Sequence, residues 1–360
     1  MTDQHPTVPS WTPQPPPARR SGIAPALVAG LIAVLLLFGG VGLFAARQTA
    51  ATAQGASSPE AAADGLVTAL GSQDFNRAAR YLDAEEAMLV ATYRDRATAL
   101  LQGRLTGPTG QPLSGLQLTA RDIRFQRVAG LGSADVGVVE LAGGTVGGRD
   151  ARGAKVELPA AELNRRLSEE SKGAVKALRL VAVRGDDDRW QVSLLASLAE
   201  QARLAAGAAE PDWSQLAGAA QPAAPGAASP EAAVDDLVAA AETGDPQAAL
   251  ERLSPAERRV LAAYQPLLAH QGAMPGAGTV RIEGLQTRTE QVTDDVAKVH
   301  ATAGRLAGSL GGREARTLDE AVAKGETPYV VTIRQDGTWY PSLVFTVTDW
   351  MLTRAERERP

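Results

Sequence analysis

The longest apolar stretch of the chain is residues 23–46, a run of mainly Ala, Leu, Val, Ile, Gly and Phe without a single charge. A helix of this length is about 36 Å long, which exceeds the roughly 30 Å hydrocarbon core of a bilayer. The run therefore predicts one transmembrane helix. Arg19 and Arg20 precede it and Arg47 follows it, so the balance of positive charge favours a cytoplasmic N-terminus and an exported C-terminus.

A cleaved signal peptide is the alternative interpretation of this segment. The apolar core of a signal peptide spans about 7–15 residues, and this run is much longer. The Ala-x-Ala pattern at 51–53 keeps cleavage after Ala53 as the alternative. We expect an uncleaved single-pass anchor in the cell membrane. Residues 1–22, which are rich in proline, then form a disordered cytoplasmic tail.

Beyond the anchor, one pattern occurs twice. The sequence Ser-Pro-Glu-Ala-Ala at 58–62 recurs at 229–233, and in each copy a stripe of apolar residues at i, i+3, i+4 and i+7 follows. Serine caps a helix, and proline suits its first position, where no N–H donor is needed. Each copy is therefore predicted to begin with an amphipathic helix, then a polar break and a brief second helix.

A third helix is predicted next in each copy. The residues Asp-x-x-Glu at 83–86 and Ser-x-x-Glu at 254–257 have the spacing of a capping box. In that motif the glutamate binds back to the N-terminus of its own helix. Tyr93 and Tyr264 occupy matching positions, which we expect to lie inside the third helix.

The later part of each copy has the alternation typical of strands. Residues 297–303 alternate small or apolar side chains with polar ones, among them His300, which indicates a half-buried antiparallel strand. Each copy ends in a predicted hairpin with Asp in its turn and Trp190 or Trp339 on the return strand. Helices followed by antiparallel strands predict an α+β fold with helices on one face of each sheet. The charged stretch 159–172 predicts an additional helix.

These patterns divide the exported part of the chain into two domains and a linker. We expect the first domain at 58–205, an Ala/Pro/Gly-rich linker at 206–228, and the second domain at 229–358. Two copies at this spacing indicate a duplicated domain, not a solenoid. Trp213 within the linker is a candidate for packing on a neighbouring domain.

The order of three helices and a sheet that ends in Asp-Gly-Thr-Trp-Tyr at 336–340 resembles the nuclear-transport-factor-2-like (cystatin-like) superfamily. The first copy departs from that motif, with Asp188 where the second has Gly337 and Gln191 where it has Tyr340. The chain is similar in layout to single-pass actinobacterial envelope proteins that carry such domains of unknown function. The resemblance implies two duplicated cone-shaped domains, each with three helices packed on an antiparallel sheet. The superfamily contains enzymes, binding modules and assembly parts, so it implies no activity.

Composition excludes several classes of function. The chain has no cysteine, which excludes disulfides, thiolate metal sites and cysteine nucleophiles. Its net charge of −5 gives no basic footprint for nucleic acid. The sequence also lacks a Walker loop, a GxGxxG fingerprint, an HExxH pair and a GxSxG elbow.

The candidates for chemistry are few. The three histidines are His5 in the tail, His270 at the predicted end of the third helix, and His300 on a strand. Catalytic members of the superfamily that the chain resembles often combine an Asp or His with a Tyr, which nominates Tyr93, Tyr264 and His300. We expect both tyrosines to be core aromatics and His300 to be a strand-surface residue. The prediction is therefore no catalytic residue, no metal and no cofactor.

The sequence favours a non-enzymatic, membrane-anchored extracytoplasmic protein that binds a ligand or partner or acts as a scaffold. One alternative is an accessory subunit of an envelope transport system. Another is an isomerase- or cyclase-like enzyme that uses the cone cavity. The expected partners are the membrane and envelope proteins, and nucleic acid is not expected; the sequence does not identify a small ligand.

Overall fold

The computed structural model describes residues 55–72, 74–101, 119–149, 155–171, 173–185, 187–217, 226–270, 281–307, 309–310, 313–314 and 327–357. The predicted tail at 1–22 and the predicted span at 23–46 lie outside these residues. Within the described ranges, no helix is both long enough and apolar enough to cross a membrane. The transmembrane helix therefore stays a prediction.

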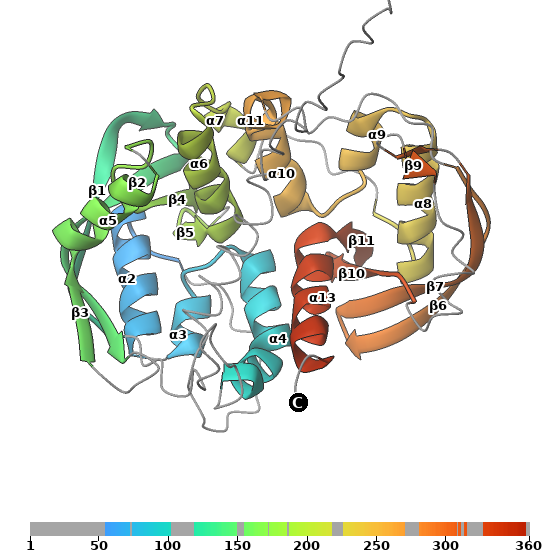
Figure 1. Cartoon of the computed structure of the whole chain (residues 1–360), viewed down its shortest axis with the longest axis horizontal. Coiled ribbons are helices and arrows are strands. Elements are labelled where there is room, and N and C mark those ends of the chain that lie inside the picture. Colours follow the sequence, from blue (N-terminus) through green and yellow to red (C-terminus); the bar gives the residue numbers. More distant parts are fainter. Residues whose placement is uncertain are drawn as a thin grey trace, which may run out of the picture.

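The described chain consists of two halves with similar successions of elements, seen side by side in Figure 1. The first half contains α2 (Pro59–Gly71), α3 (Phe75–Ala79), α4 (Ala84–Leu101), β1 (Thr119–Gly132), β2 (Val136–Arg149), β3 (Lys155–Pro159), α5 (Ala160–Glu170), β4 (Arg179–Arg184), β5 (Trp190–Ser193) and α6 (Leu194–Ala206). After the short α7 (Trp213–Leu216), the second half contains α8 (Pro230–Glu242), α9 (Pro246–Leu250), α10 (Pro255–Ala263), α11 (Gln265–His270), β6 (Arg281–Thr293), β7 (Val296–Ala307), β8 (Ser309–Leu310), β9 (Arg313–Glu314), β10 (Tyr329–Gln335), β11 (Thr338–Ser342) and α13 (Leu343–Arg357).

The first helix of each half begins as the sequence predicts. The hydroxyl of Ser58 accepts a hydrogen bond from the N–H of Ala61 at 3.1 Å, and that of Ser229 accepts one from Ala232 at 3.2 Å. A proline opens each helix, where its missing N–H costs nothing. The charged stretch that predicted an additional helix forms α5.

The third helix differs between the halves. In the first half α4 is continuous, whereas in the second Tyr264 separates α10 from α11. Pro266 lacks the N–H that a continuous helix would use, and its ring clashes with the preceding turn; Asp95 stands at the matching position of α4. The prediction that Tyr264 lies inside a helix is therefore wrong, while Tyr93 does lie inside α4.

Both large sheets are antiparallel, and corresponding strands follow the same order in the two sheets. The first runs β1-β2-β4-β5 with β3 paired to β2, and the second runs β6-β7-β10-β11. The terminal hairpins place Asp188 and Asp336 at φ angles of 61° and 49°, in the left-handed region that aspartate tolerates. Trp190 and Trp339 lie on the return strands, as predicted. The α+β class with antiparallel sheets is confirmed.

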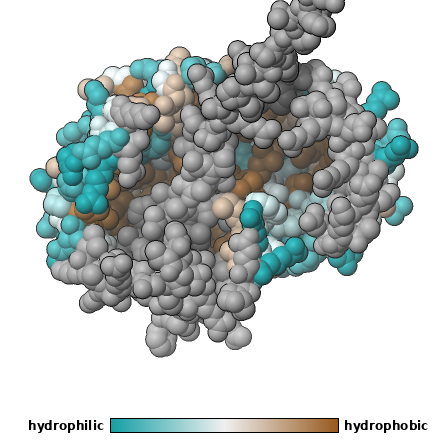
Figure 2. Space-filling model, in the orientation of Figure 1, coloured by the Kyte–Doolittle hydropathy of each residue, from teal (hydrophilic) through white to brown (hydrophobic). Residues whose placement is uncertain are grey.

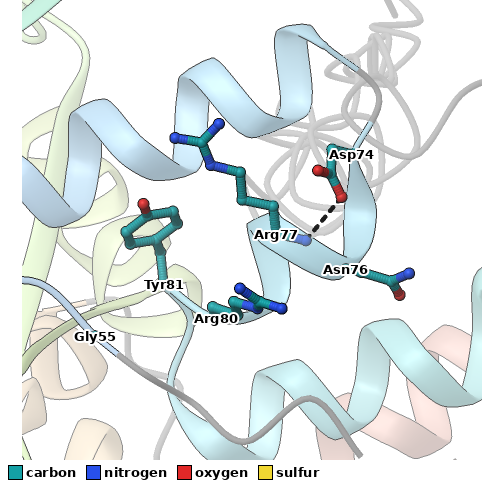
Figure 3. A pocket seen from close by; sticks show the side chains of 6 residues that line it. All are labelled: Gly55, Asp74, Asn76, Arg77, Arg80 and Tyr81. Carbon is teal, nitrogen blue, oxygen red and sulfur yellow. Dashed lines mark hydrogen bonds between the residues drawn. The ribbon is translucent and has the colours of Figure 1, made fainter. Parts of the chain in front are cut away.

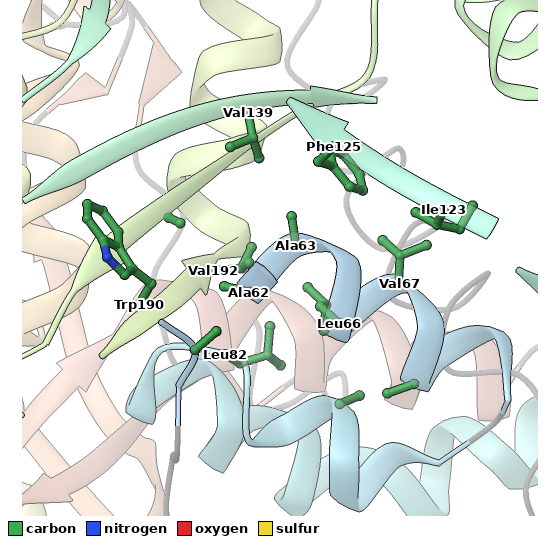
Figure 4. Close-up of a cluster of buried hydrophobic side chains, with 14 of the residues drawn as sticks. Ala62, Ala63, Leu66, Val67, Leu82, Ile123, Phe125, Val139, Trp190 and Val192 are labelled. Atoms are coloured by element: carbon green, nitrogen blue, oxygen red, sulfur yellow. The ribbon is translucent and has the colours of Figure 1, made fainter. Parts of the chain in front are cut away.

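Helices cover both faces of each sheet, so the prediction of helices on one face is wrong. The neighbouring residues Val181 and Ala182 of β4 belong to two separate buried clusters, because successive side chains of a strand point to opposite faces. One face packs against α2, where Leu66 and Val67 meet Phe125 of β1 (Figure 4). The other face packs against α6.

The two halves exchange their third helices. Leu89 and Tyr93 of α4 are buried in one cluster with Val331 of β10 and Phe345 of α13, which belong to the second half. In the reverse direction, residues of α10 and α11 are buried against the first sheet and α6, namely Val260, Ala263, Tyr264 and Leu267. Figure 1 shows α4 beside α13 and α10 beside α6. Neither half completes its own core alone.

The segment between the halves adds to this shared core. Trp213 of α7 is buried, as the sequence suggested, and its ring packs edge-on against that of Tyr264 with centroids 6.3 Å apart. The N–H of Asp212 donates to the carbonyl of Ala263 at 3.0 Å.

On the face shown in Figure 2, hydrophilic residues gather along the left and right rims and hydrophobic residues lie nearer the middle of the view.

Candidate functional site

Glu86 and Glu257 are buried carboxyl groups at matching positions of the third helices. Glu86 accepts hydrogen bonds from the Ser193 hydroxyl at 3.0 Å and from the N–H groups of Leu194 and Leu195 at 2.6 and 2.8 Å. These donors form the N-terminus of α6, which would otherwise leave buried N–H groups without partners. Burial raises the pKa of Glu86 to about 8, against the opposing effect of these hydrogen bonds.

The second half repeats this arrangement at the start of α13. Glu257 accepts from the Ser342 hydroxyl at 2.7 Å and from the N–H groups of Leu343 and Val344 at 3.0 and 2.6 Å. Burial raises the pKa of Glu257 as well. The predicted capping boxes are therefore wrong in their partner: each glutamate caps the C-terminal helix of its half and not its own helix. Both carboxyl groups have structural roles.

A third buried glutamate joins the two halves. Glu85 of α4 accepts hydrogen bonds from the hydroxyl of Ser254, the N–H of Ala256 at 3.3 Å and the side-chain amide of Gln335 at 3.1 Å, all in the second half. Burial raises its pKa to about 8, and the nearby charge of Glu257 adds to the effect. Ser254 thus donates its hydroxyl to the other half and forms no side-chain cap on α10.

The densest polar network surrounds Asp349 of α13, which is 0 % exposed. Its carboxylate accepts from the Tyr329 hydroxyl at 2.6 Å, pairs with Lys298 at 2.9 Å, and binds the guanidinium of Arg96 from α4. Burial alone would raise its pKa, but the hydrogen bonds from Tyr329 and Lys298 and the two cations outweigh burial and lower it. Asp349 is therefore an ionised anchor that holds α13 between the sheet and α4.

The first half has a corresponding carboxylate on α6. Glu200 is also fully buried and pairs with Arg203 at 2.7 Å and with Arg179 at 3.3 Å. Arg203 in turn donates to the carbonyl of Ala208 at 3.0 Å. In each network, cationic side chains pair with a buried carboxylate and so offset the cost of burying its charge. Both networks therefore have a structural role.

The nominated tyrosines lie in the shared core. Tyr93 and Tyr264 are buried, as expected for core aromatics, and the described residues give neither hydroxyl a hydrogen-bond partner. Burial first, and then the charge of Asp349, raises the pKa of Tyr93; burial and the charge of Glu200 do the same for Tyr264. Each tyrosine thus lies near the buried carboxylate of the opposite half. Both hydroxyls therefore stay protonated at neutral pH, and neither tyrosine is suited to act as a base.

His300 is not the strand-surface residue that the sequence predicted. Its side chain is 12 % exposed, its Nε2 lies 3.0 Å from a carboxylate oxygen of Glu290, and its ring packs on that of Tyr329 at 5.3 Å. The alternation of β7 places it on the face that α13 covers, beside Lys298. His270 ends α11, as predicted for the end of the third helix. His5 lies outside the described residues.

The surface feature with binding potential is a groove beside α13. Its volume is ≈ 610 Å³, and its described lining includes Pro328, Tyr329, Val347, Trp350, Arg354 and Arg357 together with three threonines. Within the described residues, the exposed large hydrophobic side chains are Leu343, Val347 and Trp350, at 46 %, 38 % and 53 %, and all three belong to α13. The guanidinium of Arg354 lies over the Trp350 ring, 5.8 Å from its centroid. Sequence reasoning missed this site because it did not predict α13.

A smaller pocket lies where the described chain begins. Its volume is ≈ 190 Å³. Figure 3 shows residues that line it, among them Gly55, Arg77, Arg80 and Tyr81. Asp74, which also lines it, accepts the N–H of Arg77 at 2.9 Å and so caps α3. The side chain of Arg77 extends away from that of Asn76 in this view, so the polar groups do not converge on one point.

No metal site is found in the part of the chain that the structure describes: no three His, Cys, Asp or Glu side chains are arranged to hold an ion. Comparisons with models of known protein families, with curated proteins and with solved structures found no match.

Proposed function

We propose that the chain is a membrane-anchored extracytoplasmic binding protein whose binding surface is the groove beside α13. The single observation that carries this proposal is the exposure of Trp350, at 53 %, on the wall of a groove of ≈ 610 Å³. Small-molecule sites are clefts of about 300–1,000 Å³ lined by apolar and aromatic side chains with a few polar groups. The groove has this size and this composition.

Binding is better supported than catalysis by the state of the buried polar groups. The carboxylates of Glu200 and Asp349 are satisfied by cations, and those of Glu86 and Glu257 by helix N-termini. A catalytic acid or base needs a group that faces the substrate. His300, the remaining nominee, is absent from the described lining of the groove. The isomerase- or cyclase-like alternative therefore has less support.

The proposal includes an origin by duplication of one cystatin-like, cone-shaped domain. It is supported by the shared strand order and by glutamates that cap the C-terminal helix in both halves. It also places the folded part outside the cytoplasm, behind the span at 23–46. Protease added to intact spheroplasts should remove the chain beyond residue 47 and spare the tail, and protection of the second half would contradict this orientation.

The test of the groove uses the full chain in lipid nanodiscs and a photoactivatable dodecanol analogue. Light-induced labelling should concentrate on the peptide that contains α13, and Trp350→Ala should reduce it about fivefold. Leu343→Ala is the matched control, because Leu343 is exposed on the same helix but is not among the described lining residues. Equal labelling of α13 in the wild type and in Trp350→Ala would contradict the proposal.

The exposed apolar face of α13 also favours a second candidate, an accessory subunit that docks on an envelope transport partner. Leu343, Val347 and Trp350 together form that face. In this case Leu343→Ala should weaken co-purification from membranes as much as Trp350→Ala does, because a docking helix buries its whole exposed stripe.

A further inference from the structure

The first half of the fold begins at Gly55, a short distance along the chain from the predicted membrane span. Gly55 comes eight positions after Arg47, the cation that follows the apolar run. At about 3.5 Å for each residue, this stretch reaches at most about 28 Å. The span therefore tethers the surface around Gly55 within this distance of the bilayer.

Two exposed arginines flank Gly55. Arg77 of α3 lines the same small pocket (Figure 3), and a Cβ atom added at Gly55 would lie 2.5 Å from the Cβ of Arg189. Arg80 lines the pocket as well, but it interacts within the chain and is not counted as part of this surface. Because the polar groups of the pocket do not converge on one point, the two arginines form a broad cationic surface and not a compact site for a small anion.

An equivalent surface surrounds Gly226 at the start of the second half. A Cβ atom added there would lie 2.5 Å from the hydroxyl oxygen of Thr338. In both halves the residue after the glycine donates its N–H to the carbonyl of the hairpin tryptophan, at 2.8 and 2.9 Å. The two surfaces can therefore be compared residue by residue.

The two arginines belong to the first half alone. Ala248 of α9 occupies the position of Arg77, and Thr338 of β11 occupies that of Arg189. The second half forms the same turns with these neutral residues, so the fold does not need either arginine. The half that follows the predicted span thus carries two cations that its copy lacks.

Two exposed aspartates share the surface with these arginines. Asp74 accepts the backbone N–H of Arg77 at 2.9 Å, and Asp187 accepts that of Arg189 at 3.1 Å. Their charges weaken the attraction of the surface for an anionic partner. The tether compensates, because it keeps the membrane at a high effective concentration around Gly55. A contact too weak to hold a free protein is therefore sufficient for a tethered one.

We propose that the surface formed by Arg77 and Arg189 rests on anionic phospholipids of the membrane in which the chain is anchored. A guanidinium presents paired donors that match the oxygens of a phosphate, and anionic headgroups attract basic residues close to a membrane span. This inference rests on the anchor in the proposed function and adds a contact that orients the folded part on the bilayer. It does not involve the groove beside α13, so the two can be tested separately.

The chain contains no cysteine, so one introduced cysteine places a fluorophore at a chosen position. Ser57→Cys and Ala228→Cys form a matched pair, because both positions are exposed and each lies two residues after its glycine. The full chain is placed in nanodiscs that contain a lipid with a spin-labelled headgroup, which quenches a nearby fluorophore. We compare zwitterionic nanodiscs with nanodiscs that contain phosphatidylglycerol.

We expect quenching at position 57 to be at least about threefold stronger in the anionic nanodiscs, and the difference to disappear at about 1 M salt. Quenching at position 228 should not depend on lipid charge. Arg77→Gln combined with Arg189→Gln should remove most of the preference at position 57. Arg281→Gln, at an exposed arginine on β6, is the matched control and should leave it unchanged. Circular dichroism of each variant checks that its fold is intact.

Four results would overturn the inference. Quenching at position 57 that does not depend on lipid charge is the first, and a preference that survives both arginine substitutions is the second. An equal preference at position 228 is the third, because it would place the contact elsewhere. These three leave the groove to its own labelling test. A chain that separates from the nanodiscs is the fourth, and it would overturn the anchor of the proposed function as well.

Discussion

The two halves of the molecule have the same framework, but their C-terminal helices expose different side chains. Both sheets have one strand order, both C-terminal helices are capped by a glutamate from the third helix, and both carry a buried carboxylate. The difference lies on the outer side of the C-terminal helix. There α6 has Gln201, which bonds to its own sheet, whereas α13 has the exposed Trp350. The comparison teaches that residues common to both halves build the fold, and residues found in one half are where function should be sought.

The largest expected effect tests the common framework. Replacing Glu86 or Glu257 with Ala removes three hydrogen bonds and leaves buried N–H donors unpaired. We expect each variant to lose about 3–5 kcal/mol of the free energy of unfolding, measured by urea denaturation. The two losses should agree within about 1 kcal/mol. A large loss in one half and a negligible one in the other would break the structural equivalence.

The next prediction concerns Glu85, which has Ala256 as its counterpart and so is found in one half only. Its pKa is raised to about 8 in the folded chain, so the folded state binds a proton that the unfolded state has released. The stabilisation that this proton provides is complete below about pH 4.5 and is lost as pH rises through about 8. Between about pH 6 and pH 9 the free energy of unfolding should fall, with about 2–3 kcal/mol due to Glu85. Glu85→Gln should reduce the fall by about that amount and leave the part due to Glu86, whose pKa is also raised to about 8. An unchanged profile in that variant would refute the assignment.

A smaller effect compares His300 with Glu140, its counterpart on β2. His300 is mostly buried and bonded to Glu290, so His300→Ala should cost about 1–2 kcal/mol, not the near-zero value of a surface site. Glu140 is more exposed and pairs loosely with Arg179 at 3.8 Å, so Glu140→Ala should cost about 0.5 kcal/mol. Thermal unfolding of both variants measures the difference. Equal costs would mean that the burial of His300 does not contribute to stability.

The smallest expected change in stability is at the groove itself. Trp350→Ala removes an exposed side chain, so it should alter the free energy of unfolding by no more than about 0.5 kcal/mol. Trp339→Ala, at a buried tryptophan of β11, should cost about 3–5 kcal/mol in the same assay. A comparable loss at both positions would show that Trp350 supports the fold and is not kept for binding.

Local patterns in the sequence predicted much of the framework. The Ser-Pro starts gave the first helices, the alternation at 297–303 gave β7, and Asp336 marked the terminal hairpin. These features depend on residues that are close together in the chain, so they can be predicted from the sequence alone. The partners of Glu86 and Glu257 depend on packing between distant segments, which is why the capping-box interpretation named the wrong helix.

The candidate site was missed for a different reason. Residues 343–357 begin with Leu-Val-Phe-Thr-Val-Thr, whose β-branched and aromatic residues favour strand, and they follow a predicted strand directly. The available signal was the spacing of Leu343, Val347 and Trp350 at i, i+4 and i+7, which marks one face of a helix. The exposure of this face depends on which side of α13 packs against α4 and β10, and no local pattern shows it.

The most direct test of the account compares the two C-terminal helices within one sample. The full chain is labelled with the photoactivatable dodecanol analogue, and the peptides that contain α6 and α13 are quantified together. The account predicts at least about tenfold more label on α13 than on α6, because α13 presents the exposed Trp350 on the wall of the groove, whereas Gln201 of α6 bonds to its own sheet. Equal label on both helices, or label mainly on α6, would contradict the assignment of binding to the second half.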